Sequence, residues 1–222
     1  MADTTWLQRA ASTLQAFRTS EHIAVSLARD LLWVVAVVGG IALALYIVAG
    51  TWPAVVTIES ESMVPNMNVG DLVLVVDEDR FGGLITRDEG LRTGYRSFGD
   101  FGDVIIYRPN GVDSVHPIIH RAMIYADTAT IEQSILGEYY RDPHGGYITQ
   151  GDNNPYIDQG NLRIPGVGVV EPVKKEWIVG KALFAVPLIG YLPLHVVEFA
   201  ILVIVIVIIH DLVFVRWKRK DE

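Results

Sequence analysis

A chain of 222 residues has room for one domain of ordinary size and a further segment. Its net charge is −8, and this acidic balance argues against a nucleic acid as partner. The chain has no cysteine, which excludes disulfides, thiolate metal sites and a thiol nucleophile. Half of the residues are hydrophobic although a fifth are charged, so the apolar residues must be unevenly distributed.

Residues 1–30 form a polar N-terminal segment whose apolar residues recur close to a helical repeat. This pattern is typical of a short helix lying on a membrane surface, and it fits a frayed tail equally well. The apolar residues concerned are Trp6, Leu7, Ala10, Leu14 and Phe17.

The first long apolar run predicts a transmembrane helix over 31–52. No charged residue occurs between 31 and 58, and about 20 helical residues are enough to cross a hydrocarbon core. The run is longer than the apolar core of a cleavable signal peptide, which has about 7–15 residues. Tyr46 and Trp52 would lie at its outer end as aromatic belt residues, which favours a spanning helix over a buried core helix.

A second apolar run predicts another transmembrane helix over 191–215, with Glu198 near its outer end. The tail that follows, 216–222, begins with a basic cluster, which predicts a cytoplasmic C-terminus. Two spans in the cell membrane then place both termini in the cytoplasm and residues 53–190 outside it. This segment carries 19 acidic against 11 basic residues, and therefore all of the net negative charge.

Residues 53–190 contain short runs rich in Val, Ile and Tyr, separated by Gly, Pro, Asn and Asp. The expected fold class is therefore a membrane-anchored, mainly β protein, with an antiparallel β domain between two transmembrane α-helices. Six glycines and four arginines between 80 and 102 predict a long mobile loop, and 138–146 predicts a second loop. The strands are expected at 72–76, 104–107, 118–125, 130–136, 147–150, 168–170 and 177–184.

The stretch from 58 to 75 connects the first predicted span to the first predicted strand. It places Ser60 and Ser62 before Met63, Pro65 and a Gly-Asp turn. A small hydroxyl residue held at a strand end beside a bilayer is a candidate nucleophile. A polar exit loop after a transmembrane helix would have the same composition.

A serine nucleophile needs a base, and the middle segment offers His116, His120 and His144. His144 lies in a Gly/Pro-rich loop, and His116 precedes a proline at a predicted strand start. His120 lies inside an apolar strand, where alternation puts it on one face with Ile118. It is the best candidate base of the three, although a histidine in such a strand is more often structural.

The segment 150–160 offers two carboxylates six residues apart, Asp152 and Asp158. Gly, Asn, Asp and Pro make surface turns by default, and such a turn could also direct both carboxylates to one site. The alternating oxygen ligands and terminal Glu of an EF-hand are missing, which argues against a calcium loop. No zinc-binding pattern such as His-Glu-x-x-His occurs.

Three motifs in order resemble signal peptidase I. They are Ser-x-Ser-Met-x-Pro followed by Gly-Asp, a strand with His-Arg, and Gly-Asp-Asn-Asn with an aspartate six residues after the first. The His-Arg pair is similar to the archaeal and endoplasmic-reticulum branch, whereas bacterial relatives have Lys at the position of His120. The resemblance covers the chain from Ile58 to about Gly160.

The resemblance implies a role for five residues. Ser62 corresponds to the nucleophile, His120 to the general base and Asp158 to the acid that completes the site. Asp152 corresponds to a supporting aspartate. Ser60 corresponds to the residue whose hydroxyl helps the Ser62 amide to form the oxyanion hole.

Two further features of the sequence bear on this resemblance. The family usually has Gly where this chain has Glu61, and a side chain there would crowd the oxyanion turn if its φ were positive. In addition, no lysine lies between the first and the third motif, because Lys174, Lys175 and Lys181 all come later. If the serine is activated, histidine is therefore the only nitrogen base within the motif region that can accept its proton.

The resulting expectation is a membrane-bound serine endopeptidase that removes signal peptides from exported preproteins at the outer membrane face, without metal or cofactor. Its expected partners are those preproteins, the lipid bilayer and the protein-export machinery. Apolar residues, among them Met63 and the strand at 72–76, are expected to form the pocket walls. The alternatives are a protease for a restricted set of precursors and a non-catalytic membrane subunit that uses its β scaffold for docking.

Overall fold

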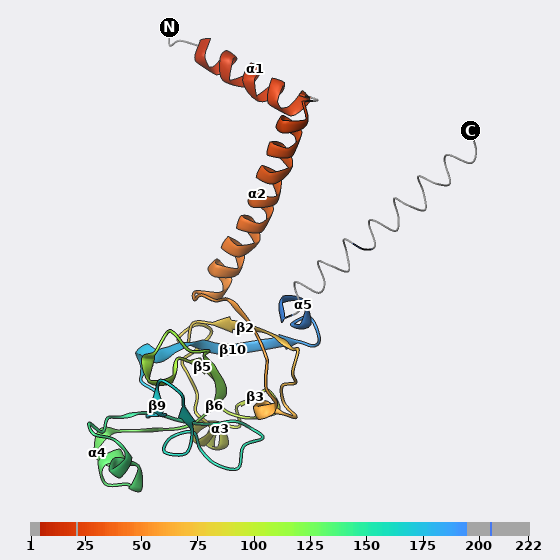
Figure 1. Ribbon diagram of the computed structural model, residues 1–222. Coiled ribbons are helices and arrows are strands. Elements are labelled where there is room, and N and C mark those ends of the chain that lie inside the picture. Colours follow the sequence, from red (N-terminus) through yellow and green to blue (C-terminus); the bar gives the residue numbers. More distant parts are fainter. Residues whose placement is uncertain (1–4, 21, 195–204, 206–222) are drawn as a thin grey trace, which may run out of the picture. The chain divides into compact units, whose positions relative to one another are not determined.

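The computed structural model describes residues 5–20, 22–194 and 205, and the chain divides into two compact units, 1–48 and 49–222 (Figure 1). The helices are α1 (Thr5–Thr19), α2 (Ile23–Ala49), α3 (Arg87–Thr93), α4 (Thr128–Glu132) and α5 (Tyr191–Leu194), with 3₁₀ turns η1 (Glu61–Met63), η2 (Pro109–Gly111), η3 (Ile135–Tyr139) and η4 (Lys175–Trp177). The strands are β1 (Val55–Thr57), β2 (Leu72–Val76), β3 (Arg96–Ser97), β4 (Asp100–Phe101), β5 (Val104–Tyr107), β6 (Ile118–Ala126), β7 (Gly146–Gln150), β8 (Arg163–Ile164), β9 (Gly168–Val169) and β10 (Ile178–Val186).

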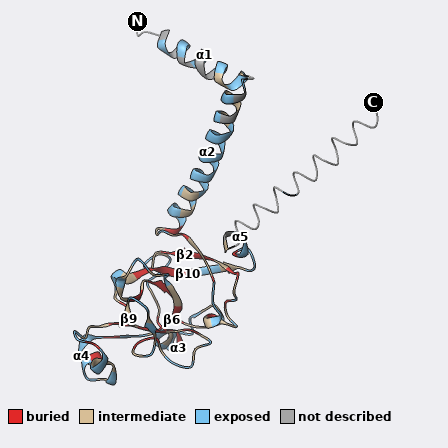
Figure 2. Cartoon of the chain, in the orientation of Figure 1, coloured by how far each residue is buried: buried red, intermediate tan, exposed pale blue. Residues whose placement is uncertain are grey.

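Helix α2 is long and apolar enough to cross a membrane over Ala24–Ala49, and its most apolar stretch of 18 residues has no residue buried within the protein (Figure 2). It begins before the predicted start at residue 31. It is the one such helix in the part of the chain that the structure describes. Of the predicted second span, only α5 and residue 205 lie within the described residues; Glu198 and the basic tail 216–222 lie outside them.

A six-stranded antiparallel sheet forms the centre of the second unit, in the order β1-β2-β10-β5-β6-β7. The prediction of a mainly antiparallel β domain is therefore confirmed. Central strand β5 is buried along its whole length. Val104 and Ile106 pack into one apolar cluster and Ile105 and Tyr107 into another, because successive side chains of a strand point to opposite faces. Protein thus covers both faces of the sheet at this point.

The segment 80–102 was predicted to be a long mobile loop, but it contains a helix and a hairpin. Thr86 and Glu89 form a reciprocal capping box that starts helix α3, and a short β3–β4 hairpin follows. Gly90 and Gly102 allow the backbones of helix and hairpin to meet, since a Cβ on Gly90 would lie 2.6 Å from the Gly102 nitrogen. Close backbone packing is one use of glycine, so a glycine-rich segment need not be an open loop.

The strand predicted at 130–136 is also wrong, because this segment folds into α4 and η3. Asp127 caps α4 by accepting a hydrogen bond from the Thr130 amide, and Ser134 caps η3 in the same manner. Only Ile131 of this segment is fully buried. The strands predicted at 72–76 and 104–107 occur with the predicted bounds, and the remaining four differ by one or two residues at their ends.

Candidate active site

The 3₁₀ turn η1, which carries Ser62, begins four residues after the end of strand β1. The Met63 side chain is buried in the core, and the Met63 carbonyl accepts hydrogen bonds from the amides of Asn66 and Met67. Ser62 is therefore half-buried on a turn whose next residue is fixed. Glu61 has a helical backbone within η1 rather than a positive φ, and its side chain is exposed. The concern that a non-glycine residue would strain this turn is thus removed.

His120 and Asp158 form a buried pair. Nδ1 of His120 lies 2.7 Å from Oδ2 of Asp158, and the two residues are 5% and 2% exposed. Strand β6 carries His120 opposite Ile105 of β5, so the imidazole is attached to the middle of the sheet. Because an ionised carboxylate only accepts, Nδ1 is the donor, and in the neutral imidazole this leaves the lone pair on Nε2.

Asp158 accepts two further hydrogen bonds at the same oxygen. Tyr107 donates its hydroxyl at 2.9 Å and Thr149 donates at 2.6 Å. Gln159 in turn donates to the Thr149 hydroxyl and accepts from the Thr149 amide. Burial, followed by the charge of Asp158, raises the pKa of Tyr107 well above its ordinary value, so this hydroxyl remains a donor. The network holds Asp158 in one orientation against the imidazole.

The turn after strand β7 connects this pair to the serine. Asn153 donates its amide to the Ser62 carbonyl at 2.8 Å and its side chain to the Glu61 carbonyl at 3.1 Å. A Cβ on Gly151 would lie 2.7 Å from the Ser62 carbonyl oxygen and 2.9 Å from Nε2 of His120. The Gly151 Cα thus fills the narrow space where the serine backbone and the free imidazole nitrogen approach each other.

Asp152 has a different partner from Asp158. It accepts two hydrogen bonds from Arg121, at 2.7 and 2.6 Å, and a third from Asn66 at 2.8 Å. Arg121 is 1% exposed and also donates to four carbonyls of the β3–β4 hairpin, those of Ser97, Phe98, Phe101 and Gly102. Asp152 therefore neutralises a buried guanidinium that fastens the hairpin to the sheet, and it does not contact His120.

The two serine hydroxyls lie side by side, with Oγ of Ser60 3.1 Å from Oγ of Ser62. Ser60 precedes η1 with an extended backbone and is exposed. The Ser62 hydroxyl thus pairs with Ser60 rather than with the imidazole. Rotation about the Cα–Cβ bond of Ser62 would redirect the hydroxyl between these two partners.

An apolar cavity of about 680 Å³ opens onto these groups. One side comes from the segment around β1 and η1, and the other from the beginning of β6. Met63 lines it as predicted, whereas no residue of β2 (Leu72–Val76) does, so that part of the prediction is wrong. The lining residues include Val56, Ile58, Ser60, Ser62, Met63, Ile106, His116, Ile118, Ile119, His120, Asn154 and Leu162.

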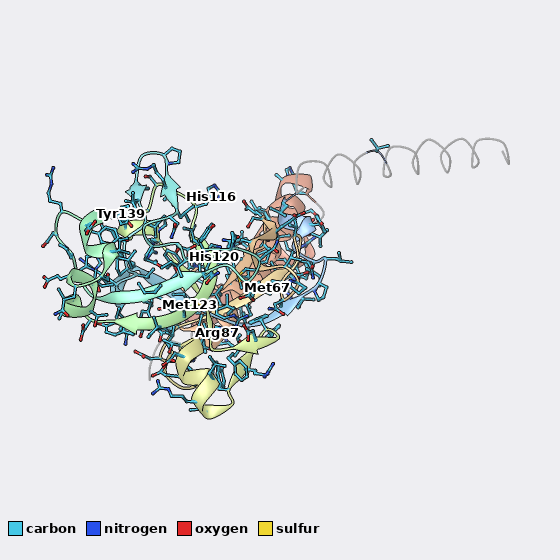
Figure 3. The ribbon with its side chains drawn as sticks, turned by 90° about the horizontal axis from the view of Figure 1, so that it is seen from below. Met67, Arg87, His116, His120, Met123 and Tyr139 are labelled. Atoms are coloured by element: carbon cyan, nitrogen blue, oxygen red, sulfur yellow. The ribbon has the colours of Figure 1, made fainter. Side chains whose placement is uncertain are left out.

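The other two candidate bases, His116 and His144, differ in their positions. His116 lines the same cavity at its exposed edge, four residues before His120, and both are labelled in Figure 3. His144, in its Gly/Pro-rich loop, is held by contacts: its Nε2 lies 3.0 Å from Glu171, and its ring packs edge-on against Trp177. Among the described residues, no group of three His, Asp or Glu side chains is placed to hold a metal ion.

The structure thus brings Ser62, His120 and Asp158 to one place and separates Asp152 from them. Sequence reasoning missed the residues that support this arrangement. Tyr107 and Thr149 carried no signal, because a Tyr or Thr in an apolar strand is ordinary core composition. Gly151 and Asn153 belong to the third motif, but only their contacts explain why a glycine and an amide are needed there. Neither the known protein-family models nor the curated proteins contain a match to this chain.

Proposed function

We propose that this protein is a membrane-bound serine endopeptidase that removes signal peptides from exported preproteins. The observation that carries the proposal is the His120–Asp158 pair, whose free imidazole nitrogen faces the Ser62 backbone across Gly151. Such an arrangement of hydroxyl, imidazole and buried carboxylate performs acyl transfer on several unrelated folds.

The chemistry follows from the hydrogen bonds. Asp158 holds His120 in the tautomer that leaves Nε2 unprotonated. The Ser62 hydroxyl turns from Ser60 towards Nε2 and gives up its proton as its oxygen attacks the peptide carbonyl. His120 then passes this proton to the leaving amine, and water hydrolyses the acyl-enzyme by the reverse route. Catalytic hydrogen bonds are often long before substrate binds, so the present serine–serine contact is compatible with this role.

Ser60 is suited to stabilising the tetrahedral intermediate. Its hydroxyl is exposed at the cavity and lies beside the nucleophilic oxygen. When Ser62 turns away, the Ser60 hydroxyl loses that partner and can donate to a developing oxyanion together with the Ser62 amide.

The substrate class rests on the apolar cavity and on the position of Ser62 in the chain. Ser62 follows the end of α2 by 13 residues, a short tether if α2 spans the membrane. A signal peptide anchors its own apolar helix in the same bilayer and presents small residues at the cleavage site. The proposed topology keeps a second span over 191–215, with both termini cytoplasmic and the β domain outside.

The test is cleavage of a model preprotein by membranes containing the full-length protein. We expect Ser62→Ala, His120→Ala and Asp158→Asn each to lower kcat by at least about 10⁴-fold, because the members of a triad act as a unit. Membrane insertion of each variant is measured in parallel by carbonate extraction. Full activity of His120→Ala would remove the proposed base. Wild-type membranes with no activity on any preprotein would favour a non-catalytic subunit.

A further inference from the structure

We propose that helix α1 lies in the plane of the membrane interface, with its apolar stripe inserted among the lipids. This inference concerns the first unit of the chain, and it does not depend on the proposed peptidase activity. The partner that the apolar stripe binds is the lipid bilayer, at the boundary between headgroups and acyl chains.

The pattern of residues along α1 supports insertion. At 100° per residue, positions 6, 7, 10, 14 and 17 occupy an arc of about 100°, the width of an apolar helix face. These positions hold Trp, Leu, Ala, Leu and Phe, and the Trp6 side chain is 63% exposed. Arg9 and Arg18 lie at the two borders of this stripe, where long cationic side chains can reach the headgroups.

The opposite face of α1 is polar but uncharged. It holds Gln8, Ser12, Gln15 and Thr19, and α1 contains no acidic residue. Ser12 donates to the Arg9 carbonyl and Thr19 to the Gln15 carbonyl, so both hydroxyls are satisfied by the helix itself. A helix with this composition must bind lipid mainly through its apolar stripe, because it has little charge for attracting a surface.

The connection to α2 restricts where α1 can go. Only Ser20, Glu21 and His22 separate the two helices, and the Arg29 side chain of α2 donates to the Arg18 carbonyl at the end of α1, at 2.6 Å. His22 caps α2 by accepting a hydrogen bond from the Ala24 amide. If α2 crosses the bilayer, a linker this short keeps α1 at the membrane surface.

The absence of cysteine allows a clean test with site-specific spin labels. Ala10→Cys places a nitroxide near the centre of the stripe. Ser12→Cys, two residues away, places it on the polar face at a similar distance from α2. Each full-length variant is reconstituted into vesicles of zwitterionic phosphatidylcholine, and collisions of the label with oxygen and with a water-soluble nickel complex are measured.

We expect the label at 10 to lie about 5–10 Å below the headgroup boundary, rich in oxygen collisions and poor in nickel collisions. The label at 12 should show the reverse, and both results should persist at high salt. Equal nickel access at the two positions would overturn the proposal, as would a label at 10 that is shielded from both reagents by protein contact. If the label at 10 were protected from the nickel complex only in vesicles that contain anionic lipid, insertion through the stripe would also be refuted. Phe17→Gln should bring the label at 10 towards water, whereas the polar-face control Thr19→Gln should leave it unchanged.

Discussion

Replacing Gly151 by alanine tests the site at its narrowest point. The added Cβ would lie 2.7 Å from the Ser62 carbonyl oxygen and 2.9 Å from Nε2 of His120. Ordinary contact begins near 3.4 Å, so the serine backbone must retreat by about 0.7 Å and the imidazole by about 0.5 Å. Neither can move easily, because Asn153 holds the first and Asp158 the second.

The expected result is a fall in kcat with little change in KM. Because a misplacement of about 1 Å can cost about 10²-fold, we expect Gly151→Ala to lower kcat by about 10- to 100-fold. The assay is single-turnover cleavage of a preprotein, with the protein in excess, so that product release does not mask the chemical step. Circular dichroism and the thermal midpoint of the variant show whether the domain remains folded.

Gly83→Ala provides the matched control for this substitution. A Cβ at Gly83 meets nothing within 4 Å, and the backbone there is not in the left-handed region. Its kcat should therefore equal that of the wild type. A folded Gly151→Ala protein with kcat within twofold of the wild type would refute the argument that Ser62 and His120 react across this glycine.

Three further outcomes are expected. Ser60→Ala should lower kcat by about 10²-fold or more, and Ser60→Thr should retain activity; a change confined to KM would argue against oxyanion stabilisation. Asp152→Asn should lower the free energy of unfolding by about 3 kcal/mol in urea titration, because Arg121 would be left as a buried, unpaired charge; an unchanged midpoint would contradict this. Hydrogen bonds from the Thr130 hydroxyl and amide hold the pKa of Asp127 below its ordinary value. The ionised Asp127 carboxylate therefore stabilises α4 fully above about pH 4, and this stabilisation is lost as the pH falls through the folded-state pKa. The Thr130 amide shift should report this loss, and in Asp127→Asn it should not titrate.

The family resemblance carried by the three motifs named residues that the structure places near one another, but it did not show how they are held. Ser62, His120 and Asp158 are the predicted nucleophile, base and acid; Ser62 and His120 line one cavity, and Asp158 is buried against the Nδ1 atom of His120. Their supports, Tyr107 and Thr149, come from two different strands of the sheet. A contact between β5 and β7 side chains depends on strand order, which alternation of apolar residues does not reveal.

The two wrong predictions of local structure have a common physical cause. Composition alone cannot distinguish a glycine that makes a chain mobile from one that lets two backbones touch, as Gly90 and Gly102 do. Similarly, the Thr-Ile-Glu-Gln-Ser-Ile-Leu run over 130–136 has strand-like residues, but Asp127, three residues before it, caps a helix that begins at Thr128. Local capping and tertiary packing decided both segments against their intrinsic propensity.

The two aspartates of the third motif illustrate how neighbours set the role of a side chain. Asp152 is bound by the guanidinium of Arg121, so its charge is cancelled within the fold. Asp158 instead accepts from His120, Tyr107 and Thr149, none of which is a permanent cation. In the proposed mechanism, its negative charge therefore stabilises the imidazolium that would form when His120 takes the serine proton. The two carboxylates could exchange partners only if Arg121 lay elsewhere in the sheet. Their separation of six residues in the sequence therefore does not assign a partner to either of them; the folded sheet does.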